Sequence, residues 1–310
     1  MPFIASRNII ALRDLLPFLY LFPFRKLATI LPPQVTRLII IPLIYVYGLL
    51  PINQKGRKSI SEMIDLIFSH TKTRKDVKKL SRQYLRNSIY TIIDDIILNK
   101  LSKKDLAKVG VINGLENLEK ALLDRKGVIL VGGHFSGDRV SKLFLREIGF
   151  PILCVRAKSP AHFSPSMSAV EKKYLVPVRI DIMNNVLKDY VFVEDKGFGI
   201  EVLKRLRKNG LVSILMDAKA RATMQGIDCS FLGSQRFFAT NYLHLAHLTG
   251  AAVIPMLCIG NSSSFTVTFG ENIELQHLPD KEEFISANLD TLVRMLEFQV
   301  LQYPTHWLMM

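Results

Sequence analysis

The chain has 310 residues, of which 49% are hydrophobic, so it can bury a sizeable core, and disorder is excluded as a description of the whole. Its formal net charge of +14 predicts an acidic partner, which could be nucleic acid, an anionic membrane surface or an acidic carrier protein. The positive mean hydropathy of +0.21 favours the membrane among these.

Residues 1–52 contain two apolar tracts that are broken by prolines and charges. The first covers 9–24, and the second covers 38–52 and carries Pro42. A spanning helix needs about 20 apolar residues, so neither tract predicts a secure transmembrane span, and no signal-peptide cleavage site follows. We expect a hydrophobic, helical, membrane-anchoring region in one leaflet, flanked by basic residues. The alternative is a buried helical hairpin of the domain formed by 53–310.

Residues 57–108 predict helices. The segment 59–71 is amphipathic with a capping-box start, and 75–101 gives a longer helix with a basic first half. The basic cluster at 72–86 is usually a solvated face. Close to a hydrophobic anchor, it is also a candidate for contact with phosphate or an acidic carrier. Aromatic residues do not interleave with it as in a nucleic-acid platform, so nucleic acid is not an expected partner.

From residue 109, strand-like and helix-like runs alternate. An alternating segment at 263–275 predicts an edge strand, and 176–182 is also expected to be extended. This βαβ alternation predicts the α/β class, with a mostly parallel central sheet flanked by helices. Buried strands are predicted for 128–131, 151–157, 211–217 and 251–260.

The stretch VILVGGHFSGDRV, residues 128–140, predicts a buried strand that opens onto a site. Two glycines turn the chain, Ser136 can cap the following helix, and His134 follows the strand's carboxyl end, where α/β sheets bind ligands. Asp138 lies one helical turn away, within reach of the imidazole. The alternative is that His134 is a surface or capping residue.

The sequence predicts neither a metal site nor a cofactor. It contains no GxGxxG or Walker loop. Cys154, Cys229 and Cys258 are far apart in apolar surroundings, which argues against a zinc site or a disulfide framework. His244 and His247 lie on an apolar helical pattern and are expected to pack or face solvent.

An ordered series of short motifs runs from about residue 55 to the end of the sequence. The motifs are Gly114-Leu115-Glu116, Gly133-His134-Phe135, Arg156, Asp217, Phe231-Leu232-Gly233, Ala239-Thr240, Gly250-Ala251 with Val253 and Pro255, and Tyr303-Pro304 with Trp307. Together they resemble the bacterial lipid A late acyltransferases of the lysophospholipid acyltransferase superfamily. The resemblance implies transfer of a fatty acyl chain from an acyl carrier protein or acyl-CoA thioester to a hydroxyl of a membrane glycolipid. It also implies a location on the cytoplasmic face of a bacterial inner membrane.

The resemblance implies that His134 is the general base and that an acid five residues later orients it. That position holds Arg139, which can only donate, while Asp138 is four residues away. We therefore predict Asp138 as the partner of His134. The alternative is a catalytically inactive member of the fold that binds lipid or carrier. Amides around Gly132, Gly133 and the helix start are expected to bind the oxyanion.

Further strand-end residues are candidates for substrate binding. The resemblance implies that Arg156 binds a phosphate of the acceptor, the alternative being a surface arginine. Asp217 is expected to hold that arginine or the acceptor, or else to cap the next helix. With Gly133 at the same edge, Lys158 and Arg221 are expected to complete an anionic-substrate pocket, although basic residues in loops are usually bystanders.

Overall fold

The central sheet and the helices that cover it are well defined in a computed structural model of the chain. The N-terminal residues to 24 and Arg221 are outside the described part. The residues that the structure describes are 25–32, 35–36, 38–39, 42, 46, 54–68, 70–98, 101–158, 172–173, 176–218, 225–260 and 264–308.

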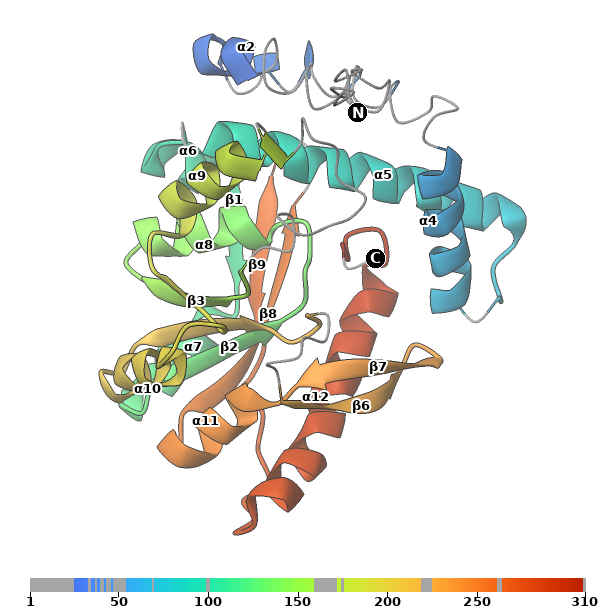
Figure 1. Ribbon diagram of the computed structural model, residues 1–310. Helices are drawn as coiled ribbons and strands as arrows, with labels where there is room; N and C mark the ends of the chain where they lie inside the picture. The colour runs from blue at the N-terminus through green and yellow to red at the C-terminus, as the bar shows by residue number, and fades with distance from the viewer. Residues whose placement is uncertain are drawn as a thin grey trace, which may run out of the picture.

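A mixed seven-stranded sheet, in the order β1-β9-β8-β2-β5-β3-β4, forms the centre of the described residues (Figure 1). Strands β8, β2, β5, β3 and β4 run parallel, while β9 is antiparallel to β8 and parallel to β1. The predicted α/β class with a mostly parallel sheet is confirmed. The strands are β1 (Gly110–Asn113), β2 (Val128–Gly132), β3 (Ile152–Arg156), β4 (Tyr190–Phe192), β5 (Leu211–Leu215), β8 (Ala252–Gly260) and β9 (Phe265–Phe269).

Strand β2 is buried along its whole length because helices cover both faces of the sheet. Ile129 and Val131 belong to one core cluster, with side chains of α10, α11 and α12. Val128 and Leu130 belong to the other, with side chains of α6, α7, α8 and α9. These helices are α6 (Lys103–Val109), α7 (Leu115–Leu123), α8 (Asp138–Glu147), α9 (Val176–Leu187), α10 (Phe198–Arg207), α11 (Asn241–Thr249) and α12 (Lys281–Gln302).

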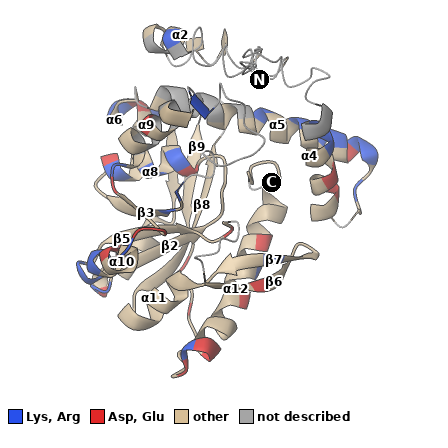
Figure 2. Ribbon diagram, in the orientation of Figure 1, with Lys and Arg blue, Asp and Glu red and all other residues tan. Residues whose placement is uncertain are grey.

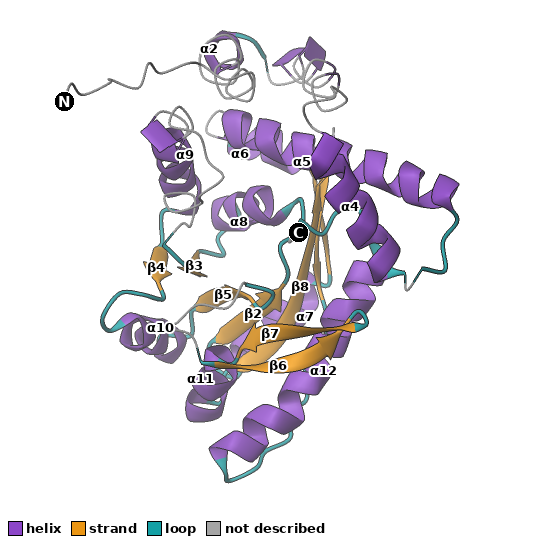
Figure 3. Ribbon diagram, turned by 45° about the vertical axis from the view of Figure 1, so that its right-hand side comes forward, coloured by secondary structure: helices purple, strands orange, loops and turns teal. Residues whose placement is uncertain are grey.

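A two-stranded hairpin, β6 (Gly226–Phe231) and β7 (Ser234–Ala239), lies beside α12 (Figure 3). Its two-residue turn is Leu232-Gly233, and both residues have positive φ, at 49° and 75°. Such a turn matches the twist of the flanking strands, and its first position is unusual for leucine. The sequence reading did not predict this hairpin.

Two predicted elements are wrong. Residues 176–182 form the start of helix α9 and are not extended, with Pro177 in the first turn, where a missing N–H costs nothing. Strand β9 is not at the edge, because it lies between β8 and β1. Its alternating pattern comes from a polar residue at every second position.

Further helices lie before α6 in the chain. α2 (Arg25–Ile30) contacts α5 (Arg74–Ile97), which pairs with α4 (Gln54–Ile67). The predicted helices in 57–108 are confirmed, but the capping-box start predicted at residue 59 is wrong, because α4 already begins at Gln54. No helix in the described residues is long and apolar enough to cross a membrane. Most of the predicted anchor at 1–52 lies outside the described residues, and its boundary with 53–310 stays a prediction.

Candidate active site

The site is built where two neighbouring parallel strands end. Gly132 of β2 lies opposite Leu215 of β5, and two residues beyond each come His134 and Asp217. The His134 Nδ1 lies 2.6 Å from Asp217 Oδ1, and the His134 backbone N–H donates to Oδ2 at 2.9 Å. The sheet register therefore brings together a histidine and a carboxylate that are 83 residues apart in the chain.

Asp217 is fully buried, and its carboxylate accepts a third hydrogen bond, from Trp307 Nε1 at 2.7 Å. Burial raises the pKa of this carboxyl, but the His134 charge and the hydrogen bonds from His134 and Trp307 outweigh it, so the pKa lies below its ordinary value. An ionised carboxylate can only accept, so Nδ1 of His134 carries a proton. In the neutral ring the lone pair is then on Nε2, on a side chain that is 38% exposed.

Residues near the C-terminus pack against the loop that carries His134. We call residues 303–308 the C-terminal strap. Within it, Trp307 forms a β-bridge with Phe135, and the Leu308 N–H donates to the His134 carbonyl at 2.7 Å. The Ser136 N–H donates to the His306 carbonyl at 2.9 Å. The loop after β2 is thus paired with the strap from His134 to Ser136.

Arg236 on β7 supports Asp217 from the hairpin side. Its Nη2 donates to the Asp217 carbonyl at 2.9 Å, and its guanidinium lies 4.9 Å from the centroid of the Trp307 ring. Gly133 permits the close approach of the carboxylate, because a Cβ there would lie 3.1 Å from Asp217 Oδ2 and 2.8 Å from Leu296 Cδ1. The role predicted for Gly133 was substrate binding, which stays a prediction.

The predicted contact between His134 and Asp138 is replaced by another. The carboxylate of Asp138 lies 2.8 Å from the ammonium of Lys142, one turn along α8. The Lys142 side chain is only 7% exposed. Burial lowers the pKa of Lys142, but the Asp138 charge outweighs it and leaves the pKa above its ordinary value. The geometry therefore makes Asp138 the counter-ion of a buried lysine, and Asp217 the partner of His134.

Two smaller expectations about this loop also need correction. Ser136 does not cap α8, whose N-cap is Gly137. The Ser136 hydroxyl lies 2.8 Å from His306 Nδ1 and donates to the Gly260 carbonyl at 3.0 Å. The amides of residues 134 to 138 all have acceptors, so these five amides are not available for the expected oxyanion contacts. The oxyanion role expected of the Gly132 and Gly133 amides stays a prediction.

The remaining predicted residues are at different places. Arg156 ends β3, half-buried, with its guanidinium 5.2 Å from the ring centroid of Tyr190. Burial lowers the pKa of Arg156, and so does the charge of nearby Arg139. Lys158 pairs with Asp195 at 2.6 Å. Arg221 lies outside the described residues.

No group of histidine, cysteine or acidic side chains in the described ranges could hold a metal ion. His247 packs its ring 4.6 Å from that of Phe284. The His134–Asp217 contact offers proton transfer by an imidazole whose tautomer is fixed by a buried carboxylate.

The model of the family described as "Bacterial lipid A biosynthesis acyltransferase" matches residues 5–164 and 189–310. The chain belongs to this family. A search of curated proteins finds no match. Among solved structures, the 1-acyl-sn-glycerophosphate (LPA) acyltransferase PlsC from Thermotoga maritima is similar at 13% identity and a TM-score of 0.36, covering 86% of this chain and 97% of that one. Membership of this family supports a transferase that moves an acyl group to a lipid.

Two residues of the site were missed by sequence reasoning as contributors to it. Trp307 was noted only as part of the terminal motif, and Arg236 was not noted. The available signal for Trp307 was its type, because a buried indole N–H needs an acceptor. No local signal pointed to Arg236.

Proposed function

We propose that this family member transfers a fatty acyl chain from an acyl carrier protein or acyl-CoA thioester to a hydroxyl of a membrane glycolipid resembling a lipid A precursor. His134 is the general base, and Asp217 orients it. The observation that carries this proposal is the 2.6 Å contact between His134 Nδ1 and the buried Asp217 carboxylate at the carboxyl edge of the sheet.

The proposed reaction uses the free nitrogen of the imidazole. Nε2 accepts the proton of the acceptor hydroxyl while the oxygen of that hydroxyl attacks the thioester carbonyl carbon. As the tetrahedral intermediate collapses, the new ester C–O bond remains, the C–S bond breaks, and the imidazolium returns its proton to the leaving thiolate. Asp217 stays ionised throughout and stabilises the imidazolium.

Arg156 is our candidate for binding a phosphate of the acceptor. It ends a strand at the same edge of the sheet as His134, and the charge of Arg139 reaches it. The same positive pair favours the second candidate function, an inactive protein that binds an anionic lipid without acylating it. A measurement of acyl transfer activity distinguishes these two functions. We further propose that the protein works on the cytoplasmic face of a bacterial inner membrane.

The test is an acyl transfer assay with purified protein and a lipid A precursor. Acyl carrier protein thioesters and acyl-CoA thioesters are supplied in separate reactions, and mass spectrometry detects the gain of one acyl group. We expect His134→Ala to lower the rate by ~10²–10⁴-fold, the usual contribution of a general base. If no donor gives a product with the parent protein, or if His134→Ala is fully active, the proposal is wrong.

A further inference from the structure

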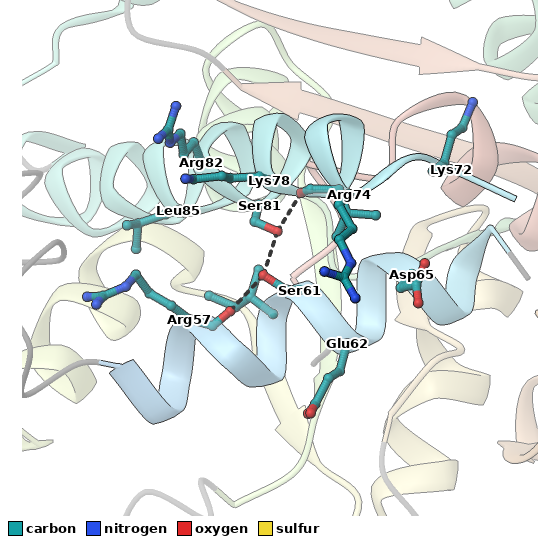
Figure 4. A pocket seen from close by; sticks show the side chains of 12 residues that line it. Arg57, Ser61, Glu62, Asp65, Lys72, Arg74, Lys78, Ser81, Arg82 and Leu85 are labelled. Atoms are coloured by element: carbon teal, nitrogen blue, oxygen red, sulfur yellow. Dashed lines mark hydrogen bonds between the residues drawn. The ribbon is translucent and has the colours of Figure 1, made fainter. Parts of the chain in front are cut away.

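Helices α4 and α5 enclose a groove of about 610 Å³ that the active site does not use. The helices cross where Ser61 and Ser81 meet, with their hydroxyl oxygens 3.1 Å apart (Figure 4). The volume is in the range of pockets that bind small ligands. The groove therefore has room for a headgroup-sized molecule.

The two ends of the groove differ in charge. Figure 4 shows Arg57, Lys78 and Arg82 around Leu85 at one end, and Glu62 and Asp65 beyond the serine contact. Both carboxylates already have partners: the Lys58 ammonium lies 3.6 Å from Glu62, and His70 Nδ1 lies 2.6 Å from Asp65. The end at Arg57 thus has a concentration of positive charge with no carboxylate among the groove residues beside it.

Two of these cations are free to bind an anion. Lys78 and Arg82 are one helical turn apart on the same face of α5, and both are exposed. Within the described part of the chain, neither forms an ion pair. Figure 2 shows that lysine and arginine dominate this region of α5 and its junction with α4.

The lining of the groove is not purely polar. Ile60, Val77 and Leu85 contribute apolar surface, and Val77 belongs to the small core between the helices. Inorganic phosphate would leave this surface in contact with water. An anion with an attached hydrocarbon chain would bury it, at roughly 25 cal/mol per Å² of apolar area.

The N-terminal segment that contacts α5 favours a lipid over a protein as the source of that anion. α2 contacts α5, and in this segment Ile30 is 79% exposed and Leu38 is 75% exposed. Large apolar side chains this exposed mark an interaction surface when they occur together. Helix α5 thus carries a basic groove at its α4 end and contacts an exposed apolar segment elsewhere, a combination that suits charged headgroups and hydrocarbon.

We propose that the α4–α5 groove binds the phosphate headgroup of an anionic phospholipid, with the cations at its Arg57 end on the phosphate and the apolar lining on the first carbons of the acyl chains. This site is separate from the His134–Asp217 pair and binds lipid whether or not acyl transfer occurs. Its test can therefore fail while the proposed function stands, and the reverse.

The experiment measures binding of the full chain to vesicles of phosphatidylcholine alone and to vesicles that also contain phosphatidylglycerol. The test variant is Lys78→Gln with Arg82→Gln. The control is Lys75→Gln with Lys79→Gln, which removes the same charge from the same helix outside the groove. We expect the test variant to bind phosphatidylglycerol vesicles roughly 30-fold more weakly, about fivefold per basic residue, while the control loses much less and binding to phosphatidylcholine is unchanged.

Equal losses in the two variants, or no loss in the test variant, would overturn the proposal, because general surface charge would then explain the binding. A second titration compares dihexanoylphosphatidylglycerol with glycerol phosphate. We expect the lipid to bind more tightly, and equal affinities would also contradict a lipid site. If the test variant instead loses binding only to purified acyl carrier protein, the groove is a carrier-docking surface and the lipid proposal is wrong.

Discussion

At the residue scale, the site depends on one buried carboxylate with three donors. Asp217 Oδ1 faces His134 Nδ1, while Oδ2 accepts from the His134 amide and from Trp307 Nε1. A buried charge is tolerated when such partners replace water. The same contacts hold the His134 ring in one orientation and one tautomer. The hydrogen bonds that compensate the burial of Asp217 therefore also orient the proposed base.

The Asp138–Lys142 pair allows the alternative assignment of the acid to be tested. Breaking a buried ion pair typically costs about 3–5 kcal/mol, because it leaves one charge uncompensated. We therefore expect Asp138→Asn to lower the free energy of unfolding by about that amount, measured by urea denaturation. Any loss of activity in this variant would reflect unfolding.

The double variant Asp138→Leu with Lys142→Met removes both charges and keeps the volume apolar, a replacement that is often neutral or stabilising. We expect it to fold and to retain acyl transfer at a rate close to that of the parent. A folded double variant without activity would show that Asp138 takes part in the chemistry after all.

The sequence alone could identify His134 but not its partner. The glycine turn after an apolar strand marks the histidine locally. The acid, however, is 83 residues away, and only the register between β2 and β5 brings it close. Choosing the nearest acid in the chain pointed to Asp138, because spacing reports on neighbours along a helix and not across a sheet.

At the element scale, the C-terminal strap joins the catalytic loop to the helical pair. Asn87 of α5 donates to the Thr305 carbonyl at 2.9 Å, and Leu308 packs on the small core that contains Ile64 of α4. Trp307 then reaches Asp217. The strap is thus in contact with both the groove helices and the active site.

Trp307 is a positioning residue, and its effect can be separated from packing by pH. Its N–H favours the ionised carboxylate, so Trp307→Phe should raise the pKa of Asp217. Because the base needs an ionised partner, the acid limb of the kcat profile should move to higher pH. The lost charge-assisted hydrogen bond should also cost about 1.5–3 kcal/mol in stability. A uniform fall in kcat with an unmoved acid limb would mean that Trp307 only packs.

Sequence patterns predicted the strands that are buried on both faces of the sheet. The strands β2, β5 and β8 were evident as apolar runs because both faces are covered. Helix α9 was mistaken for a strand because its alternating valine and isoleucine residues resemble one, whereas in the fold it packs as a helix against α8 and α5. The β6–β7 hairpin was missed because its turn has leucine, not asparagine or aspartate, before glycine.

At the scale of the whole molecule, folding and the proposed catalysis both depend on the ionisation of Asp217. Its folded pKa is depressed, so it contributes stability that is fully present above the unfolded value of about 3.9 and is lost as pH falls through the folded value. We expect Asp217→Asn to be less stable than the parent at neutral pH. The difference should shrink below about pH 4.

Urea denaturation of the parent and the variant across this pH range measures that difference. If the two unfolding free energies differ by the same amount at pH 7 and well below pH 4, the stability of the parent does not depend on an ionised Asp217. The depressed pKa would then be contradicted, along with the tautomer argument built on it.

The central claim is that Asp217 orients His134 for proton transfer. The most direct measurement is kcat for acyl transfer by a folded Asp217→Asn variant, beside the Asp138→Leu, Lys142→Met control. Replacing the orienting aspartate of a serine hydrolase triad lowers kcat by roughly 10⁴. We expect a loss approaching that size, with the control variant active. A folded Asp217→Asn variant that transfers acyl groups at the parent rate would contradict it.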